Sequence, residues 1–75
     1  MSKESQPVIQ NAIAANLAAL AQRLARAAAL AKEAEEAMQR GEQNLAIGTV
    51  IGFDHILPEA QALYNAAIAL HRSWT

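Results

Sequence analysis

Apolar residues recur at alternating steps of four and three along the first half of the chain. The stripe covers about four heptads and consists of Ile13, Leu17, Leu20, Leu24, Ala27, Ala31, Ala34 and Met38. This spacing is typical of the a/d seam of a left-handed coiled coil, in which one helix face packs against a neighbouring helix. A parallel stripe of small residues predicts a second helical neighbour: Ala14, Ala18, Ala21, Ala25 and Ala28.

The first helix is predicted to span residues 7–40, because no Gly or Pro lies between Pro7 and Gly41. Proline suits the first turn of a helix, where its missing N–H is not needed, and glycine commonly follows the last turn. At 1.5 Å per residue this helix is about 50 Å long. Residues 1–6 are expected to form a flexible polar lead-in, so the single domain covers residues 7–75.

The second half of the chain carries another stripe with the same alternation: Thr49, Phe53, Ile56, Ala60, Leu63, Ala67, Leu70 and Trp74. It predicts one helix from about Leu45 to Ser73, kinked or interrupted near Pro58. Residues 45–57 are rich in Ile, Val and Thr, so they remain open as helix, broken helix or extended chain. Asn44 is a candidate N-cap for this helix, and Asp54 is one for a segment that starts after a complete break.

The two predicted helices are joined by residues 41–44, a polar turn of the length that connects antiparallel helices. Folding the chain there makes positions that sum to about 85 face each other. Gly48 and Gly52 then lie opposite the alanine-rich end of the first helix, and large residues face large residues at the other end. The predicted fold is therefore an all-α antiparallel helical hairpin that assembles into a four-helix bundle.

Charge is scarce on both helices, although 53% of the residues are hydrophobic. No Asp, Glu, Lys or Arg occurs in residues 7–22 or in residues 60–71. A helix that is apolar on most sides is normally buried, and two helices cannot bury each other completely. A core of this size supplies only about 3–5 kcal/mol, and the absence of Cys excludes disulfides as reinforcement. Association with other chains is the expected source of further burial.

The net charge is −1 and the basic residues are scattered, so the sequence does not predict a basic patch that would bind nucleic acid or an anionic membrane. Arg23 and Arg26 oppose a membrane span over the first helix, because each arginine costs about 2.5–3.5 kcal/mol at bilayer depth. The start of the chain carries no cationic region leading into an apolar one, as a secretory signal would. We expect a small bacterial protein of the cytoplasm.

The densest polar constellation in the second helix is formed by Asp54, His55 and Glu59, with His55 and Glu59 spaced to reach one ligand. A diiron bundle needs Glu-x-x-His motifs, and neither helix has one. We interpret Asp54 as a cap or an ion-pair partner of Lys32, and His55 as partly exposed. No cofactor or metal is predicted, and no nucleophile has a plausible base, so the chain is not expected to be an enzyme.

Gly48-x-x-x-Gly52 has the spacing of closely packed helices, and it indicates either self-association, a hinge, or a close crossing over Ala34 and Ala37. Trp74 in the last turn is expected to be buried in an interface, where aromatic residues often dominate binding. The predicted interface residues are Ile13, Leu17, Leu20, Leu24, Gly48, Gly52, Phe53, Leu63, Tyr64, Ile68, Leu70 and Trp74.

Three functions remain open. The first is a non-enzymatic homo-oligomer, a dimer or tetramer, whose apolar flanks form the assembly surface. The second is an adaptor that binds a different helical protein; in size and outline the chain is similar to the helical-hairpin co-chaperones of bacterial type III secretion, with no shared motif and no residue roles carried over. The third is a noncatalytic subunit that completes an enzyme's active site with His55 and Glu59.

Overall fold

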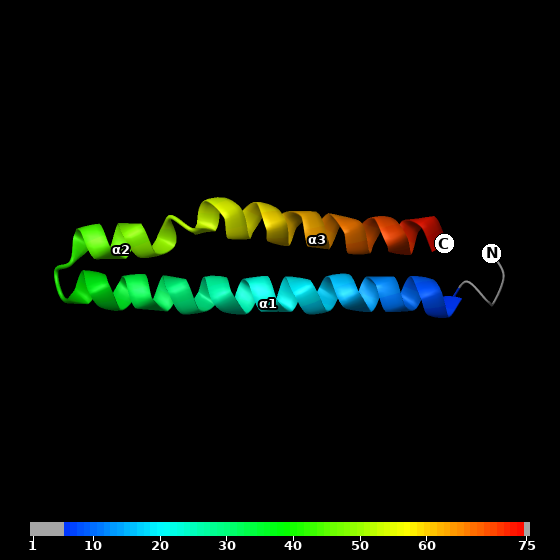
Figure 1. Cartoon of the computed structure of the whole chain (residues 1–75), viewed down its shortest axis with the longest axis horizontal. Helices are drawn as coiled ribbons and strands as arrows, with labels where there is room; N and C mark the ends of the chain where they lie inside the picture. The colour runs from blue at the N-terminus through cyan, green and yellow to red at the C-terminus, as the bar shows by residue number, and fades with distance from the viewer. Residues whose placement is uncertain (1–5, 75) are drawn as a thin grey trace.

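The computed structural model describes residues 6–74 and shows an antiparallel helical hairpin (Figure 1). Helix α1 covers Gln6–Gln39, and helices α2 (Gln43–Val50) and α3 (Phe53–Trp74) return along it. The predicted all-α hairpin is confirmed, with no strand in residues 6–74. The molecule measures 59 × 15 × 13 Å, and its radius of gyration of 17.3 Å exceeds the roughly 11 Å of a compact domain of this length. Such a thin rod has little interior.

The turn between α1 and α2 is closed by two backbone hydrogen bonds. The Gly41 N–H donates to the Met38 carbonyl at 2.9 Å, and the Glu42 N–H donates to the Ala37 carbonyl at 2.9 Å. This pair of bonds is a Schellman motif, in which the residue just after the helix adopts a left-handed backbone conformation. Gly41 fills that place with φ 77°, so the predicted helix stop is confirmed. Glu42, not Asn44, occupies the N-cap position of α2, so the predicted cap is wrong.

The returning helix is interrupted at residues 51–52 and not at Pro58, which lies inside α3. The first N–H groups of α3 donate hydrogen bonds to carbonyl groups of residues 51–52. The His55 N–H, for example, donates to the Gly52 carbonyl at 3.0 Å. Glycine has the lowest helix propensity after proline, and a β-branched run precedes it, so the helix is weakest here. Asp54 is the second residue of α3 and not its cap, which corrects the sequence-based interpretation.

The core of the hairpin consists almost entirely of alanine. Its buried residues are Ala27, Ala34, Ala37, Ala46, Ile56, Ala60 and Ala67. The tightest part lies near the turn, where Ala37 and Ala46 are 1% and 2% exposed and Val50 packs against them. Small side chains allow two helix backbones to approach closely. The predicted packing of small against small at this end is confirmed, but different residues provide it.

Ala46 and Val50, rather than the two glycines, face α1 near the turn. A Cβ atom added at Gly48 or Gly52 would meet no atom within 4 Å, so neither glycine permits a close crossing over Ala34 and Ala37. The overall register is nevertheless close to the predicted sum of 85. Arg23 on α1 pairs with Glu59 on α3, for example, at a sum of 82.

The packed stripe of α1 differs from the predicted one in every second position. Ile13, Leu20, Ala27 and Ala34 are buried or half-buried as predicted. The alternate positions Leu17, Leu24 and Met38 are instead 48%, 50% and 49% exposed, and Ala31 is exposed too. Their place in the contact is taken by residues on the other flank of the same stripe: Asn16, Arg23, Leu30 and Ala37. The hairpin thus packs the more polar flank and leaves Leu17, Leu24 and Met38 outside.

Candidate functional site

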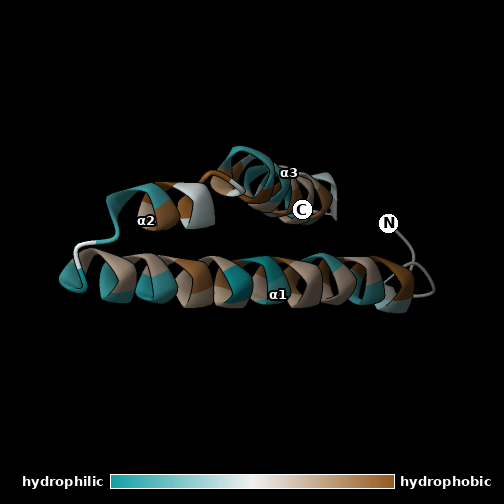
Figure 2. Ribbon diagram, turned by 60° about the vertical axis from the view of Figure 1, so that its left-hand side comes forward, coloured by the Kyte–Doolittle hydropathy of each residue, from teal (hydrophilic) through white to brown (hydrophobic). Residues whose placement is uncertain are grey.

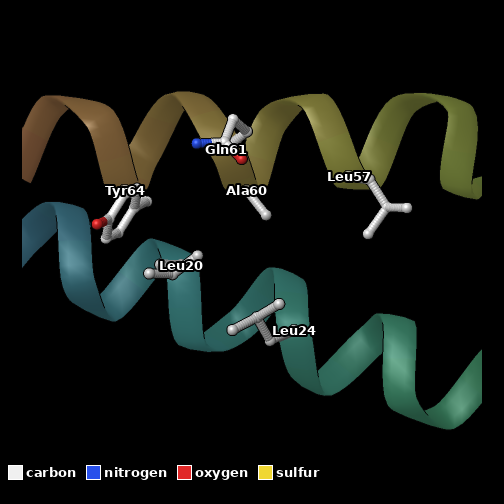
Figure 3. Close-up of a pocket in the computed structure, with 6 residues that line it drawn as sticks. All are labelled: Leu20, Leu24, Leu57, Ala60, Gln61 and Tyr64. Atoms are coloured by element: carbon white, nitrogen blue, oxygen red, sulfur yellow. The ribbon is translucent and has the colours of Figure 1, made fainter.

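A groove of about 470 Å³ runs between α1 and α3, midway along the rod (Figure 3). Leucines from α1 and residues from α3 line it: Leu20, Leu24, Leu57, Ala60, Gln61 and Tyr64. Figure 3 shows Leu20 and Leu24 on one helix and Leu57, Ala60 and Tyr64 on the other projecting into the space between the two backbones. The lining is apolar except for the Gln61 amide and the Tyr64 hydroxyl, so it offers shape and hydrophobic surface rather than reactive groups.

The groove is part of a longer surface, the apolar face, which we define as Leu17, Leu20, Leu24, Leu57 and Tyr64. Residues seven apart lie two helical turns apart on one side of a helix, so Leu17 extends the line of Leu24 along α1. Leu57 and Tyr64 are related in the same way on α3. Leu57 and Tyr64 are each 50% exposed, like Leu24. Contiguous exposed side chains of this size mark interaction sites in water-soluble folds.

The opposite flank of the hairpin is charged. Glu59 precedes the buried Ala60 and Gln61 follows it, so their side chains point about 100° to either side of Ala60. Gln61 lines the groove, and Glu59 therefore lies away from it. Its carboxylate accepts a hydrogen bond from the Arg23 Nε at 2.9 Å, in an ion pair whose side chains are 38% and 50% exposed. An exposed pair of this kind contributes less than about 1 kcal/mol. Hydrophilic and hydrophobic residues alternate along α1 and both occur on α3 (Figure 2), so the two flanks differ through the side chains that each helix turns to them.

The structure divides the residues that the sequence predicted for the interface into two groups. Half-buried inside the hairpin are Ile13, Leu20, Gly52, Phe53, Leu63, Ile68 and Leu70. Exposed are Leu17, Leu24, Gly48 and Tyr64. Trp74 ends α3, and its side chain lies outside the described residues. The apolar face unites three of the exposed residues with the half-buried Leu20.

Leu57, Ala60 and Gln61 are the groove residues that the sequence-based interface prediction missed. Leu57 and Tyr64 each follow a residue of the predicted seam, Ile56 and Leu63, and are seven positions apart. That repeat was the available signal, because two large residues at heptad spacing beside a seam form a second stripe.

The polar constellation of α3 is dispersed. Glu59 pairs with Arg23, and the ion pairs among residues 6–74 do not include the suggested contact of Asp54 with Lys32. No group of three or more metal-ligating side chains occurs within the described residues. Within residues 6–74, no helix combines the length and apolarity needed to cross a bilayer.

Comparison with known proteins adds no functional information: no protein-family model matches the chain, and no curated protein or solved structure is significantly similar to it.

Proposed function

We propose that this chain is a non-enzymatic assembly module that forms a homodimer, with the apolar face of one hairpin packed on the apolar face of a second copy to make a four-helix bundle. The observation that carries the proposal is the exposure of Leu17, Leu24, Leu57 and Tyr64 at about half of each side chain. The hairpin packs its less hydrophobic flank internally, so folding alone leaves the larger side chains in contact with water. A second hairpin removes that contact.

The dimensions of the rod support a second copy of the chain as the partner that covers the apolar face. The rod is 59 Å long and 15 Å wide, so the outline of one whole flank, polar and apolar parts together, covers about 900 Å². Stable protein interfaces of standard size bury about 800 Å² per partner. One flank is therefore sufficient for one partner, and the charged flank with the Arg23–Glu59 pair stays in water.

The composition of the face also favours self-association. In a twofold dimer the same patch meets itself, so the patch must be self-complementary. The apolar face contains no charged side chain, so no like charges are brought together when it meets its own copy. Its neighbours on α1 are alanines, which let leucines of another helix approach.

Sedimentation equilibrium of the purified chain over a wide concentration range tests the proposal. We expect the wild type to show twice the 8.0 kDa mass of one chain. Leu24→Asp should sediment as a monomer, because a buried, unpaired carboxylate is strongly unfavourable. The matched control is Leu45→Asp, because Leu45 is 54% exposed but lies on the other flank. Leu45 precedes the buried Ala46, whereas Leu57 follows the buried Ile56, so the two side chains point to opposite sides of the returning helices.

The control variant should remain a dimer. A wild-type chain that is helical and monomeric at every concentration would refute the proposal. Equal dissociation of the Leu24→Asp and Leu45→Asp dimers would refute it too. Circular dichroism of each variant confirms that the hairpin itself is still folded.

A further inference from the structure

We infer that the two copies dock antiparallel, with the twofold axis crossing the rods at the level of Gln61, so that α1 packs on α1 of the second copy and α3 on α3. The inference rests on the proposed homodimer. It concerns the direction of docking, which the apolar face alone does not decide. Two observations favour the antiparallel arrangement over the parallel one, and the side chains of α1 are compatible with it.

The first observation is the distribution of charge along the rod. Residues 27–50, at the turn end, carry two positive and four negative side chains, a net charge of −2. Residues 6–22 carry no charged side chain, and residues 63–73 carry only Arg72, so the described part of the open end has no excess of negative charge. The middle of the rod is neutral. Antiparallel docking keeps the two negative turn ends apart, whereas parallel docking places them together.

The second observation is the position of Gln61. The middle of α1 (Gln6–Gln39) lies at residues 22–23, and the hairpin register places Gln61 at that level. Full overlap of two antiparallel rods requires the axis to pass through their midpoint, so Gln61 then faces its own copy. One N–H of the amide already donates to the Asn65 side-chain oxygen at 3.0 Å. The second N–H and the carbonyl suit a reciprocal pair, because an amide both donates and accepts.

Parallel docking gives Gln61 a less suitable environment. At its level the second copy would then present α1 with Leu24 and its alanine neighbours, which offer no hydrogen-bonding side chain. A buried amide without partners is unfavourable. A single polar residue at an otherwise apolar contact commonly selects one register in this way.

The fit of large residues to small ones on α1 is compatible with this axis. With the axis at residues 22–23, Leu24 lies level with Ala21 of the second copy, and Leu17 lies level with its Ala28. Both alanines are exposed, so both are accessible to a partner. Alternation of large and small residues across an interface lets the two layers interdigitate.

Disulfide trapping measures the docking direction, because the chain contains no Cys and each introduced thiol is unique. Two variants place the thiol near the axis (Ala21→Cys and Gln61→Cys), and two place it far away (Ala14→Cys and Glu35→Cys). Antiparallel docking predicts that the first two form intermolecular disulfides roughly tenfold or more faster than the second two, because proximity raises the effective thiol concentration. It also predicts that Ala14→Cys mixed with Ala31→Cys forms a heterodimer disulfide. Leu45→Cys, on the charged flank, is the slow control.

The outcomes separate this inference from the proposed function. Equal self-trapping rates at Ala14, Ala21 and Glu35, together with a dimer in sedimentation, would overturn antiparallel docking and leave the homodimer intact. A monomer without trapping at any position would overturn both. Salt gives a second readout on the unmodified chain: a parallel dimer should tighten as salt rises, because salt screens the repulsion between its two negative turn ends, whereas an antiparallel dimer should not tighten.

Discussion

Replacing Gly48 by alanine should stabilise the protein, although the same change at Gly41 should destabilise it. Gly48 lies inside α2, and a Cβ atom there meets nothing within 4 Å. Gly41 is equally free of neighbours, but its φ of 77° lies in the left-handed region. The two substitutions therefore remove the same hydrogen and add the same methyl group, and only the backbone conformation differs.

The magnitudes follow from that difference. Alanine is better than glycine in a helix by about 0.8–1 kcal/mol, so Gly48→Ala should raise the free energy of unfolding by about 0.5–1 kcal/mol per chain. A left-handed conformation costs an alanine about 1–2 kcal/mol, so Gly41→Ala should lower the free energy of unfolding by about 1 kcal/mol. In a domain of this size 1 kcal/mol corresponds to a change in Tm of about 4–8 °C.

Thermal unfolding followed by circular dichroism, at one matched chain concentration, measures both shifts. Equal concentration is needed because the Tm of a dimer depends on it. Gly48→Ala should raise Tm and Gly41→Ala should lower it. A decrease in Tm for Gly48→Ala would refute the reasoning, since it would mean that a neighbouring backbone lies against Gly48, within the hairpin or from another copy.

Three further substitutions test other parts of the structure. Leu24→Ala removes about three carbon atoms that are half exposed, about 1 kcal/mol per copy and 2 kcal/mol per dimer, so sedimentation should show a Kd about 30-fold weaker with unchanged helicity; an unchanged Kd would contradict the apolar face as the interface. Ala37→Leu forces a larger side chain into the tightest contact, where Ala37 is 1% exposed, so urea unfolding should show a loss of about 1–3 kcal/mol, and a loss within error would contradict that close approach. Glu59→Gln breaks the exposed pair with Arg23 and should lower stability by less than about 1 kcal/mol at low salt and by even less at high salt; a larger, salt-independent loss would argue against a surface ion pair.

Much of the fold was predictable because its signals are local. The long uninterrupted run of helix formers, the glycine stop and the short polar turn each depend on nearby residues, and together they indicate an antiparallel hairpin. The register followed from the same turn, since its length sets which residues of the two helices lie level. The break at residues 51–52 was harder to place, because Pro58 is the stronger helix breaker by propensity alone and the structure tolerates it within α3.

The candidate site was predictable only in part. Leu17, Leu24 and Tyr64 were predicted as interface residues, whereas Leu57 and Gln61, each one position away from the predicted seam, were not. Gly48 and Gly52 were expected to pack against α1, yet Ala46 and Val50 do so. A rotation of about 160° around a short helix separates these alternatives, because they are two residues apart, and no local signal in the sequence decides it.

The sequence by itself determined that two long helices lie side by side and which residues are level with each other, because helix propensity and turn length act over a few residues. Only the tertiary structure decided which flank of α1 is packed inside. Ile13, Leu20, Ala27 and Ala34 serve either flank equally well, so the heptad pattern is compatible with both. The choice depends on contacts between distant residues, above all the tight approach of Ala37 to Ala46 and Val50 on the return helix. Those contacts leave Leu17 and Leu24 outside, and the apolar face exists for that reason.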